Sequence, residues 1–373
     1  MIKKRYIFLQ ATTSPYRTEL FNVIHEEGAR FNVEITVFYY RKMMGDRSWK
    51  FDPIELKHPH KIFNAFEFFI KNYPFYFSLS ILRDLRKQKV DELILGVSWN
   101  DFIILKIVLL KRLGIIKNKL HFWTEANYMA GGMKKNYRLL DAVRSWVFGA
   151  VDGQLLIPGK IAEKTIRDYW NLQHDVLLFP NTVKIDYSTT QSIDLAKNKI
   201  NVLIVARLNE KIKGVLNFIK SIDKRDLEAC HFYIAGDGPD RVLYEDFIKI
   251  NNFTNITMLG AIEREKVLSY YKSSDLFVLP SFSDPNPLSV IEALNAKLPL
   301  FISNQCGNVS EAVINGFNGF SFDPYNKYDI WVKFKDLILN KENFSRFGNN
   351  SFVLANKYFN YRNVVHHFLE KFS

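Results

Sequence analysis

The sequence of 373 residues has few cysteines and no long apolar run. Its two cysteines, Cys230 and Cys306, are too few for the disulfide framework of a secreted protein, so we expect small apolar residues in a reducing compartment. The nearest candidate for a membrane span, Phe102–Leu110, is too short and contains Lys106. The apolar residues near the start end at Gln10 without a small-residue cleavage site, which argues against a signal peptide. We therefore expect a cytoplasmic protein.

The composition is that of a globular protein, because hydrophobic residues make up 47% of the chain and charged residues 24%. The net charge of +12 is unevenly distributed. Residues 1–180 contain 28 Lys and Arg against 18 Asp and Glu, whereas residues 181–373 contain 23 against 21. The basic excess of the first half favours an anionic partner there.

Short apolar runs alternate with amphipathic stretches, the pattern of parallel sheets covered by helices. The predicted strands are Arg5–Leu9, Val33–Tyr39, Leu93–Gly96, Leu120–Trp123, Gln154–Ile157, Val176–Phe179, Val202–Val205, Phe232–Ala235, Ile256–Leu259, Leu276–Leu279 and Leu300–Ser303. The predicted helices are Thr18–His25, Leu79–Lys87, Asp101–Arg112, Arg138–Phe148, Ala162–Tyr169, Val215–Ile222, Arg241–Ile250, Arg264–Tyr271, Ser289–Ala296, Asn308–Ile314 and Tyr361–Phe372.

The alternation breaks after Pro180-Asn181-Thr182, and the following residues are polar without strong periodicity. We therefore predict a first domain at 1–182, a linker at 183–200 and a second domain at 201–358, with 359–373 as a helix that crosses back to the first domain. The fold class is α/β, with two doubly wound Rossmann-like domains facing across a cleft. Ligands of such folds bind at the carboxyl ends of the strands.

Two basic residues follow the first predicted strand of the second half. Arg207 lies just after that strand, and Lys213-Gly214 opens the next predicted helix. The free amides and the dipole of a helix amino terminus bind anions, and two cations beside them suit a diphosphate. The alternative is that both side chains are ordinary solvated cations.

Glycines and carboxylates mark two further strand ends. Gly236 and Gly238 permit a tight turn and close approach of the backbone to a ligand, although a plain strand-to-helix turn also explains them. Asp284 lies in a Pro-rich loop, and Glu292 lies one turn into the next predicted helix. Carboxylates accept paired hydrogen bonds from hydroxyls, so we expect ribose and a sugar as ligands. The alternative for Glu292 is a solvated helix glutamate.

In this order, the segments resemble the nucleotide-sugar-binding domain of family 4 glycosyltransferases, retaining GT-B enzymes, here of the bacterial surface-polysaccharide type. The resemblance is strong over residues 200–322. The matching segments are Ala206-Arg207 with Lys213-Gly214, Ala235-Gly236-Asp237-Gly238-Pro239, Leu259-Gly260, Ser274–Ser281, Glu292-Ala293-Leu294 and Asn315–Gly319. The family has two glutamates with seven residues between them. Here Asp284 takes the place of the first and Glu292 that of the second.

The resemblance implies a role for each matching residue. Arg207 and Lys213 would bind the donor diphosphate and stabilise the departing nucleotide. Glu292 would hold the ribose hydroxyls, and Asp284 would lie beside the donor sugar. Further donor contacts are implied for Leu288 and Ser289 through their backbone, Ile262 beside the base, Gly236, Gly238 and Ser14. The family needs no metal in the site, and this sequence has no Asp-x-Asp motif or His/Cys cluster.

Three features depart from the family pattern. Asp284 is one methylene shorter than glutamate. Pro285 and Pro287 replace glycines and so remove two amide donors. Ser14 and Pro15 stand where many members have a Gly-Gly turn.

The first half contains the expected acceptor side of the cleft. Glu125, after a predicted strand, is the candidate to orient or deprotonate an acceptor hydroxyl, against the alternative of a simple loop carboxylate. His121 starts that strand, and we expect it to be a core or edge histidine. Residues 128–135 form an apolar and basic loop suited to an acceptor entrance.

Residues 61–77 are rich in phenylalanine, and several basic residues follow nearby: Lys106, Lys111, Arg112, Lys117 and Lys119. Apolar and cationic groups together suit an anionic bilayer surface. The alternative is that the aromatic residues belong to the core and the lysines to a solvated face.

We conclude that the sequence predicts a retaining glycosyltransferase of the hexosyltransferase class. It would move a sugar from a nucleotide-sugar donor to a glycan or lipid-linked glycan at the inner face of the cell membrane, without a cofactor. One alternative is another GT-B enzyme, a phosphorylase or a nucleotide-sugar epimerase. The other is a basic nucleic-acid-binding protein, against which stand the dispersed basic residues and the absence of a helix-turn-helix, zinc or single-strand-binding signature.

Overall fold

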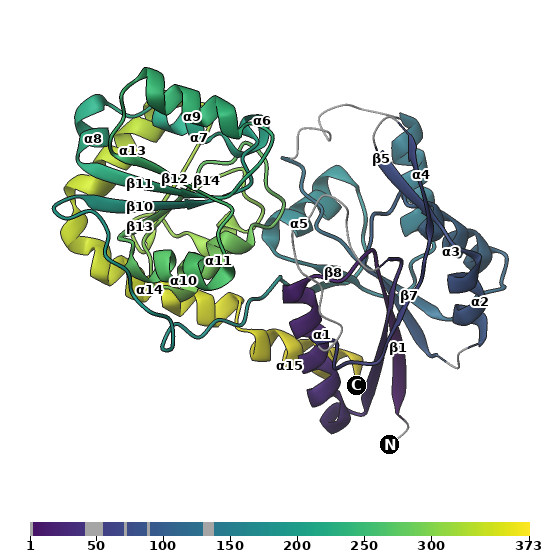
Figure 1. The fold of residues 1–373 in the computed structure, drawn as a ribbon. Coiled ribbons are helices and arrows are strands. Elements are labelled where there is room, and N and C mark those ends of the chain that lie inside the picture. Colours follow the sequence, from purple (N-terminus) through teal and green to yellow (C-terminus); the bar gives the residue numbers. More distant parts are fainter. Residues whose placement is uncertain (1–2, 42–54, 71–72, 88–89, 130–137) are drawn as a thin grey trace.

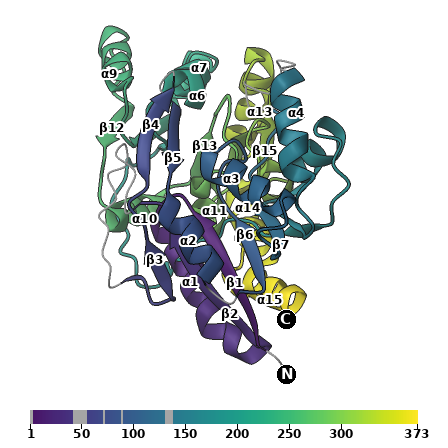
Figure 2. The same ribbon diagram turned by 90° about the vertical axis from the view of Figure 1, so that its right-hand side faces the viewer.

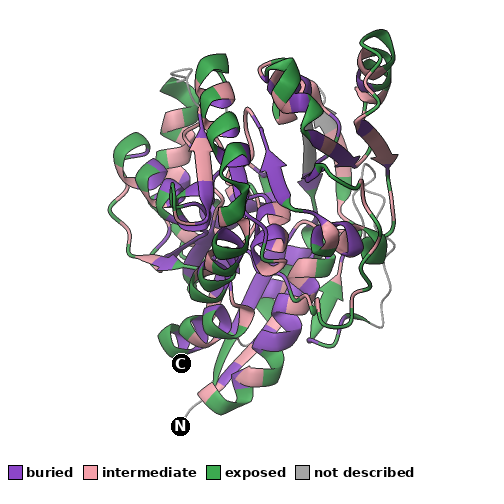
Figure 3. Cartoon of the chain, turned by 90° about the vertical axis from the view of Figure 1, so that its left-hand side faces the viewer, coloured by how far each residue is buried: buried purple, intermediate pink, exposed green. Residues whose placement is uncertain are grey.

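The computed structural model describes residues 3–41, 55–70, 73–87, 90–129 and 138–373. Two lobes lie side by side, each built on a sheet covered by helices (Figure 1). Buried residues concentrate in the strands, and exposed residues cover the outer faces of the helices (Figure 3). This is the predicted α/β class with two Rossmann-like halves.

The first lobe contains a seven-stranded parallel sheet in the order β3-β2-β1-β6-β7-β8-β9. Its strands are β1 Lys4–Gln10, β2 Val33–Tyr39, β3 His60–Ile62, β6 Glu92–Leu95, β7 Lys119–Trp123, β8 Leu155–Ile157 and β9 Val176–Leu178. The order reverses between β1 and β6. Such a reversal opens a crevice at the carboxyl ends of the two strands.

The helices of this lobe cover both faces of the sheet. They are α1 Pro15–Gly28, α2 Leu79–Lys87, α3 Phe102–Arg112, α4 Arg138–Phe148 and α5 Lys160–Lys164, with single turns at Ala29–Phe31 and Thr165–Tyr169. Asp101 caps α3 by accepting a hydrogen bond from the backbone N–H of Ile103 at 2.9 Å. The face of α3 that carries Ile104 and Ile107 then packs into the core.

An antiparallel hairpin, which the sequence analysis did not predict as strands, projects from the first lobe. Its strands, β4 Phe66–Ile70 and β5 Tyr73–Phe77, lie side by side (Figure 2). Glu67 attaches the hairpin to the end of β2, because it accepts a 2.7 Å hydrogen bond from Arg41; within the hairpin it also accepts one from the Tyr76 hydroxyl at 3.0 Å.

The second lobe contains a six-stranded parallel sheet in the order β12-β11-β10-β13-β14-β15, with its reversal between β10 and β13. Its strands are β10 Ile200–Val205, β11 Cys230–Ala235, β12 Ile256–Gly260, β13 Leu276–Leu279, β14 Leu300–Ser303 and β15 Gly319–Phe322. Its helices are α6 Glu210–Lys213, α7 Val215–Ile219, α8 Lys224–Glu228, α9 Arg241–Ile250, α10 Arg264–Ser273, α11 Leu288–Asn295, α12 Val309–Ala312, α13 Lys327–Leu339 and α14 Phe344–Tyr358, with a single turn at Lys341–Asn343. Both cysteines are free and buried in this lobe.

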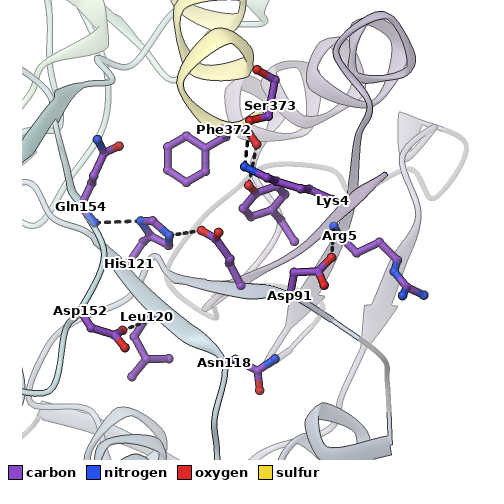
Figure 4. Close-up of polar contacts among 12 residues, drawn as sticks. Lys4, Arg5, Asp91, Asn118, Leu120, His121, Asp152, Gln154, Phe372 and Ser373 are labelled. Atoms are coloured by element: carbon purple, nitrogen blue, oxygen red, sulfur yellow. Dashed lines mark hydrogen bonds and ion pairs between the residues drawn. The ribbon is translucent and has the colours of Figure 1, made fainter. Parts of the chain in front are cut away.

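The last helix, α15 Tyr361–Phe372, packs against α1 in the first lobe (Figure 1). The ring of Phe368 lies 5.7 Å from Phe8 and 5.2 Å from Phe179. The Tyr6 hydroxyl donates a 2.6 Å hydrogen bond to the carbonyl of Phe372, and Lys4 bonds to the carbonyl of Ser373 (Figure 4). The chain therefore passes between the lobes twice. Within the described residues, no helix is both long and apolar enough to cross a membrane.

Candidate active site

The crevice of the second lobe lies where β10 and β13 end side by side. The Lys213 ammonium forms an ion pair there with the Asp284 carboxylate, and both side chains are largely buried. Two residues on separate strand connections, 71 positions apart, thus meet at the expected ligand-binding edge.

The backbone explains why these two connections meet. The carbonyl of Ile212 accepts hydrogen bonds from the N–H groups of Phe282 and Ser283, at 2.8 and 3.2 Å. Gly214 has a φ of 59°, and a Cβ at this position would lie 2.8 Å from the carbonyl oxygen of Pro280. Glycine therefore permits both the turn and the close approach that brings Lys213 to Asp284.

Arg207 is exposed just beyond β10, and its backbone position is fixed from the next connection. The N–H of Leu208 donates a 3.0 Å hydrogen bond to the carbonyl of Asp237. The structure thus places Arg207 and Lys213 on the same short connection. Both cations of the predicted diphosphate site therefore belong to this segment.

The predicted anion site at free helix amides is wrong for the helix that follows Lys213. The carboxylate of Glu210 already accepts hydrogen bonds from the N–H groups of Leu216 and Asn217, at 3.0 and 2.9 Å, and from the Tyr244 hydroxyl at 2.7 Å. A negative charge therefore occupies the amino terminus of α7, so anion binding at this edge depends on side chains.

The two glycines after β11 lie close to the backbone of the segment that follows β10. A Cβ on Gly236 would lie 1.9 Å from the carbonyl oxygen of Ala206, and one on Gly238 would lie 2.3 Å from that of Leu208. Both glycines therefore shape the segment that carries Arg207. This close packing of backbone against backbone requires glycine at both positions.

Glu292 lies on α11, only partly exposed, and is not the solvated glutamate of the alternative interpretation. Burial raises the pKa of its carboxyl group, while the charge of Arg264 and a hydrogen bond with Tyr271 act in the opposite direction. Tyr187 donates a 3.1 Å hydrogen bond to the backbone carbonyl of Glu292. Residues of α10 therefore surround the carboxyl group, and a residue of the predicted linker holds the backbone beside it.

Three other predicted donor residues, Leu288, Ser289 and Ile262, are partly exposed. Leu288 and Ser289 start α11 directly after the Asp284 loop, and the carbonyl of Ser289 accepts a hydrogen bond from the Tyr271 hydroxyl at 3.2 Å. Ile262 follows β12 and packs against the core of the lobe. In the described part of the chain, no group of three or more His, Cys, Asp and Glu residues could hold a metal ion.

In the first lobe, Glu125 is part of a polar network. Its carboxylate accepts a 3.1 Å hydrogen bond from Arg17 and a 2.9 Å hydrogen bond from the side chain of Asn181. Arg17 also lies 3.8 Å above the centre of the Trp123 ring. Ser14 is buried and directly precedes α1. Residues 130–137 of the predicted acceptor loop lie outside the described residues.

His121 is a core residue, as expected. It is buried, and its ring hydrogen-bonds the Glu92 carboxylate on one side and accepts from the N–H of Gln154 at 2.9 Å on the other (Figure 4). The ring also contacts that of Phe372 at 4.8 Å. These residues line a cavity of about 170 Å³ at the amino ends of the strands, on the opposite side from the crevices.

Comparisons with known proteins find similarity in the second half of the chain. Residues 188–352 match the family described as Glycosyl transferases group 1. The chain is 30% identical over 146 residues to an uncharacterised glycosyltransferase of Methanocaldococcus jannaschii, covering 39% of this chain and 40% of that protein. It is 26% identical over 196 residues to alpha-monoglucosyldiacylglycerol synthase of Acholeplasma laidlawii, covering 47% of this chain and 46% of that protein. The chain therefore spans less than half the length of each of these two relatives.

Solved structures resemble the whole chain. The sucrose-phosphate synthase of Thermosynechococcus elongatus has a TM-score of 0.73 at 14% identity, with 99% of this chain and 98% of that chain covered. Anabaena HepE in complex with UDP has a TM-score of 0.73 at 13% identity, with 98% and 99% covered. The lipopolysaccharide outer core galactosyltransferase WaaB has a TM-score of 0.70 at 15% identity, also with 98% and 99% covered. The GT-B fold is confirmed.

The sequence analysis missed Asp101 in the crevice of the first lobe. This residue follows β6, is buried, and lies close enough to the Tyr40 and Tyr76 hydroxyls to act on them electrostatically. Burial raises the pKa of Asp101 to about 7, although its hydrogen bond from Ile103 opposes the shift. From the sequence, Asp101 was placed only as the first residue of the predicted helix Asp101–Arg112. Nothing in the sequence signalled its burial beside two phenols.

Proposed function

We propose that the protein is a retaining glycosyltransferase that uses a nucleotide-sugar donor. The observation that carries this proposal is the edge where β10 and β13 end, at which Lys213 is paired with the carboxylate of Asp284 and Arg207 lies on the same connection as Lys213. The group 1 domain and the relatives named above support the reaction class. HepE, which shares the fold, was crystallised with UDP.

In this reaction the bond between the anomeric carbon and the diphosphate oxygen breaks, and its electron pair leaves with the nucleotide. Arg207 and Lys213 would stabilise that growing negative charge by charge-assisted hydrogen bonds. Glu292 would hold the ribose hydroxyls, and Asp284 would contact the sugar. The new bond forms to an acceptor oxygen, whose proton would pass to the carboxylate of Glu125. The two cations supply the charge for this departure, so we propose that no metal takes part.

The acceptor proposal rests on the first lobe. Phe66 and Phe77 on the hairpin expose 69% and 40% of their surface, and the Lys106 ammonium lies 4.8 Å from the Phe77 ring centre. Exposed aromatic rings with an adjacent cation suit the surface of an anionic bilayer. We propose a glycan or lipid-linked glycan acceptor in surface polysaccharide synthesis, with the protein at the inner face of the cell membrane.

The basic part of that surface is smaller than the sequence analysis expected. Lys111 is largely buried and bonds to the Asp152 carboxylate at 2.7 Å and to the carbonyl of Asn118 at 2.7 Å. Arg112 bonds to the carbonyl of Trp146 at 2.8 Å. Lys106 is therefore the basic residue that the structure places directly beside the exposed aromatic rings.

Thermal-shift titration with nucleoside diphosphates and nucleotide sugars tests the donor proposal, because a ligand that binds only the folded state raises its stability. We expect stabilisation of the wild type and a weaker response in Glu292→Gln, which alters a group buried at the site. The conservative variant Tyr187→Phe removes only a bond to the backbone of Glu292 and serves as the control. Absence of stabilisation by every nucleotide would overturn the proposal. The anomeric configuration of the product, read by NMR, tests retention.

A further inference from the structure

The two lobes touch through a buried carboxylate. Glu311 on α12 of the second lobe accepts a 2.8 Å hydrogen bond from the backbone N–H of Lys160, which starts α5 of the first lobe. Only 6% of the surface of Glu311 is exposed. The two residues are 151 positions apart. This hydrogen bond therefore links the two lobes directly.

Gly159 makes this contact sterically possible. Its backbone is extended, with φ of 171° and ψ of −170°, so the conformation itself does not demand glycine. A Cβ at this position would nevertheless lie 2.8 to 2.9 Å from the carboxyl atoms of Glu311, which are its three nearest neighbours. The Glu311 carboxyl therefore occupies the space that a side chain at residue 159 would fill.

A short path leads from Glu311 to the loop that carries Asp284. The N–H of Glu311 donates to the carbonyl of Asn308 at 3.2 Å. The side chain of Asn308 donates to the carbonyl of Pro287 at 3.0 Å, and the N–H of Gly307 donates to the carbonyl of Asp284 at 2.8 Å. The segment that contacts the first lobe is therefore bonded directly to the proposed donor-sugar loop.

The surroundings of this path are polar and incompletely hydrogen-bonded. Buried atoms without a hydrogen-bond partner among the described residues include Oε2 of Glu311, Oδ1 of Asn308, Nδ2 of Asn127 and both amide atoms of Asn286. Burial raises the pKa of Glu311, opposed by the hydrogen bond and the charge of Lys160. Unpaired buried polar groups oppose permanent closure of an interface, which suits a contact that forms and breaks.

We propose that Glu311 is a positioning residue for transfer: through Lys160 it sets the distance between the acceptor lobe and the donor loop. This inference rests on the proposed function only for its kinetic readout. The nucleotide would bind to the second lobe alone. Transfer, in contrast, needs the acceptor oxygen near the anomeric carbon, and small displacements of reacting groups cost much of the rate.

Four variants test this arrangement from both lobes. Glu311→Ala removes the acceptor of the hydrogen bond, and Gly159→Ala places a methyl group against the carboxyl. Each should lower kcat by on the order of 10²-fold while leaving UDP affinity unchanged. Glu311→Gln retains an acceptor oxygen and should stay near the wild type. In the double variant Gly159→Ala/Glu311→Ala the methyl group no longer meets a carboxyl, so its effect should not exceed that of either single change.

Small-angle scattering supplies a readout that does not need enzymatic activity. The radius of gyration should increase in Glu311→Ala and Gly159→Ala and stay unchanged in Glu311→Gln. Glu92→Ala, which removes the buried partner of His121 within the first lobe, is the control for simple loss of stability. Multiplicative effects in the double variant, or unchanged scattering and kcat in both single variants, would overturn the inference. An inactive wild type whose variants still expand would refute the proposed function but not the contact.

Discussion

The Lys213 ammonium is paired with the Asp284 carboxylate. A diphosphate that approaches this edge must therefore compete with a carboxylate of the protein for the same cation. Each charge of the pair compensates the other, which matters because most of each side chain is buried.

Asp284→Asn should have opposite effects on UDP affinity and on turnover. We expect UDP affinity to rise several-fold because Lys213 loses its competing anion, and we expect turnover to fall because the contact to the donor sugar is lost. Isothermal titration with UDP and a transfer assay measure the two effects. Asp246→Asn, which removes an exposed negative charge from α9, controls for net charge. A loss of UDP affinity in Asp284→Asn would contradict a competitive role.

Arg207→Ala and Lys213→Ala should each lower turnover strongly. Losing one charge-assisted contact to the departing diphosphate costs roughly 2–4 kcal/mol of transition-state stabilisation. Steady-state kinetics with a saturating donor check this. The matched control is Lys211→Ala, because Lys211 is an exposed cation on the same short helix. Near-normal turnover in both Arg207→Ala and Lys213→Ala would contradict the proposal that the diphosphate binds at this edge.

Asp101 predicts an unusual pH dependence of stability. Its pKa is raised by burial to about 7, so the native state holds a proton that the unfolded chain has already released above its ordinary value of 3.8. Between the ordinary pKa of 3.8 and the raised pKa of about 7, the free energy of unfolding therefore falls as pH rises, by about 1.4 kcal/mol for each pH unit. Asp101→Asn stays neutral and still caps α3, so its stability relative to the wild type should increase from pH 5 to pH 8.

Urea unfolding of the wild type and of Asp101→Asn at pH 5 and pH 8 measures this difference in stability. Asp152→Asn is the control: burial alone would raise the pKa of Asp152, but hydrogen bonds from Leu120 and Lys111 lower it below its ordinary value. Its contribution to stability is complete at both pH 5 and pH 8. An unchanged difference between Asp101→Asn and the wild type would show that the Asp101 carboxyl ionises normally.

The exposed rings of the hairpin predict membrane binding with two components. Lys106→Gln should weaken sedimentation with acidic vesicles at low salt, because the screening length is about 10 Å at 0.1 M. Phe66→Ser with Phe77→Ser should weaken the binding that persists at high salt. Lys224→Gln on the second lobe, whose side chain is 85% exposed, is the control. Equal binding of all these variants would favour a soluble saccharide acceptor.

The parallel sheets were predictable because each strand is an apolar run between amphipathic helices. The hairpin was not, because its phenylalanines do not alternate cleanly with polar residues and its polar anchor, Arg41, lies 26 positions before Glu67. β15, α13 and α14 were also missed. α13 and α14 lie beyond residues 200–322, where the family resemblance is strong. The apolar residues of β15, α13 and α14 are buried by packing against the rest of the lobe.

Within the site, residue types were predictable but their partners were not. Sequence position alone suggested free amides before α7, whereas the carboxylate that binds them comes from Glu210, six and seven residues earlier. The partners of Glu125 are still more distant: Arg17 is 108 positions before it and Asn181 is 56 after it. Such pairings depend on how strands are ordered in the sheet, which local patterns do not contain.

Because α15 belongs to the core of the first lobe, that lobe is assembled from two separate parts of the chain. During synthesis, residues 200–358 emerge before the helix that covers Tyr6 and Phe8. The second lobe is thus the first to have its entire sequence available for folding, and the lobe that starts the chain is the last to be completed. A cleavage in the exposed segment around Thr189 and Gln191 would leave two fragments that still share one hydrophobic core, and these fragments should copurify.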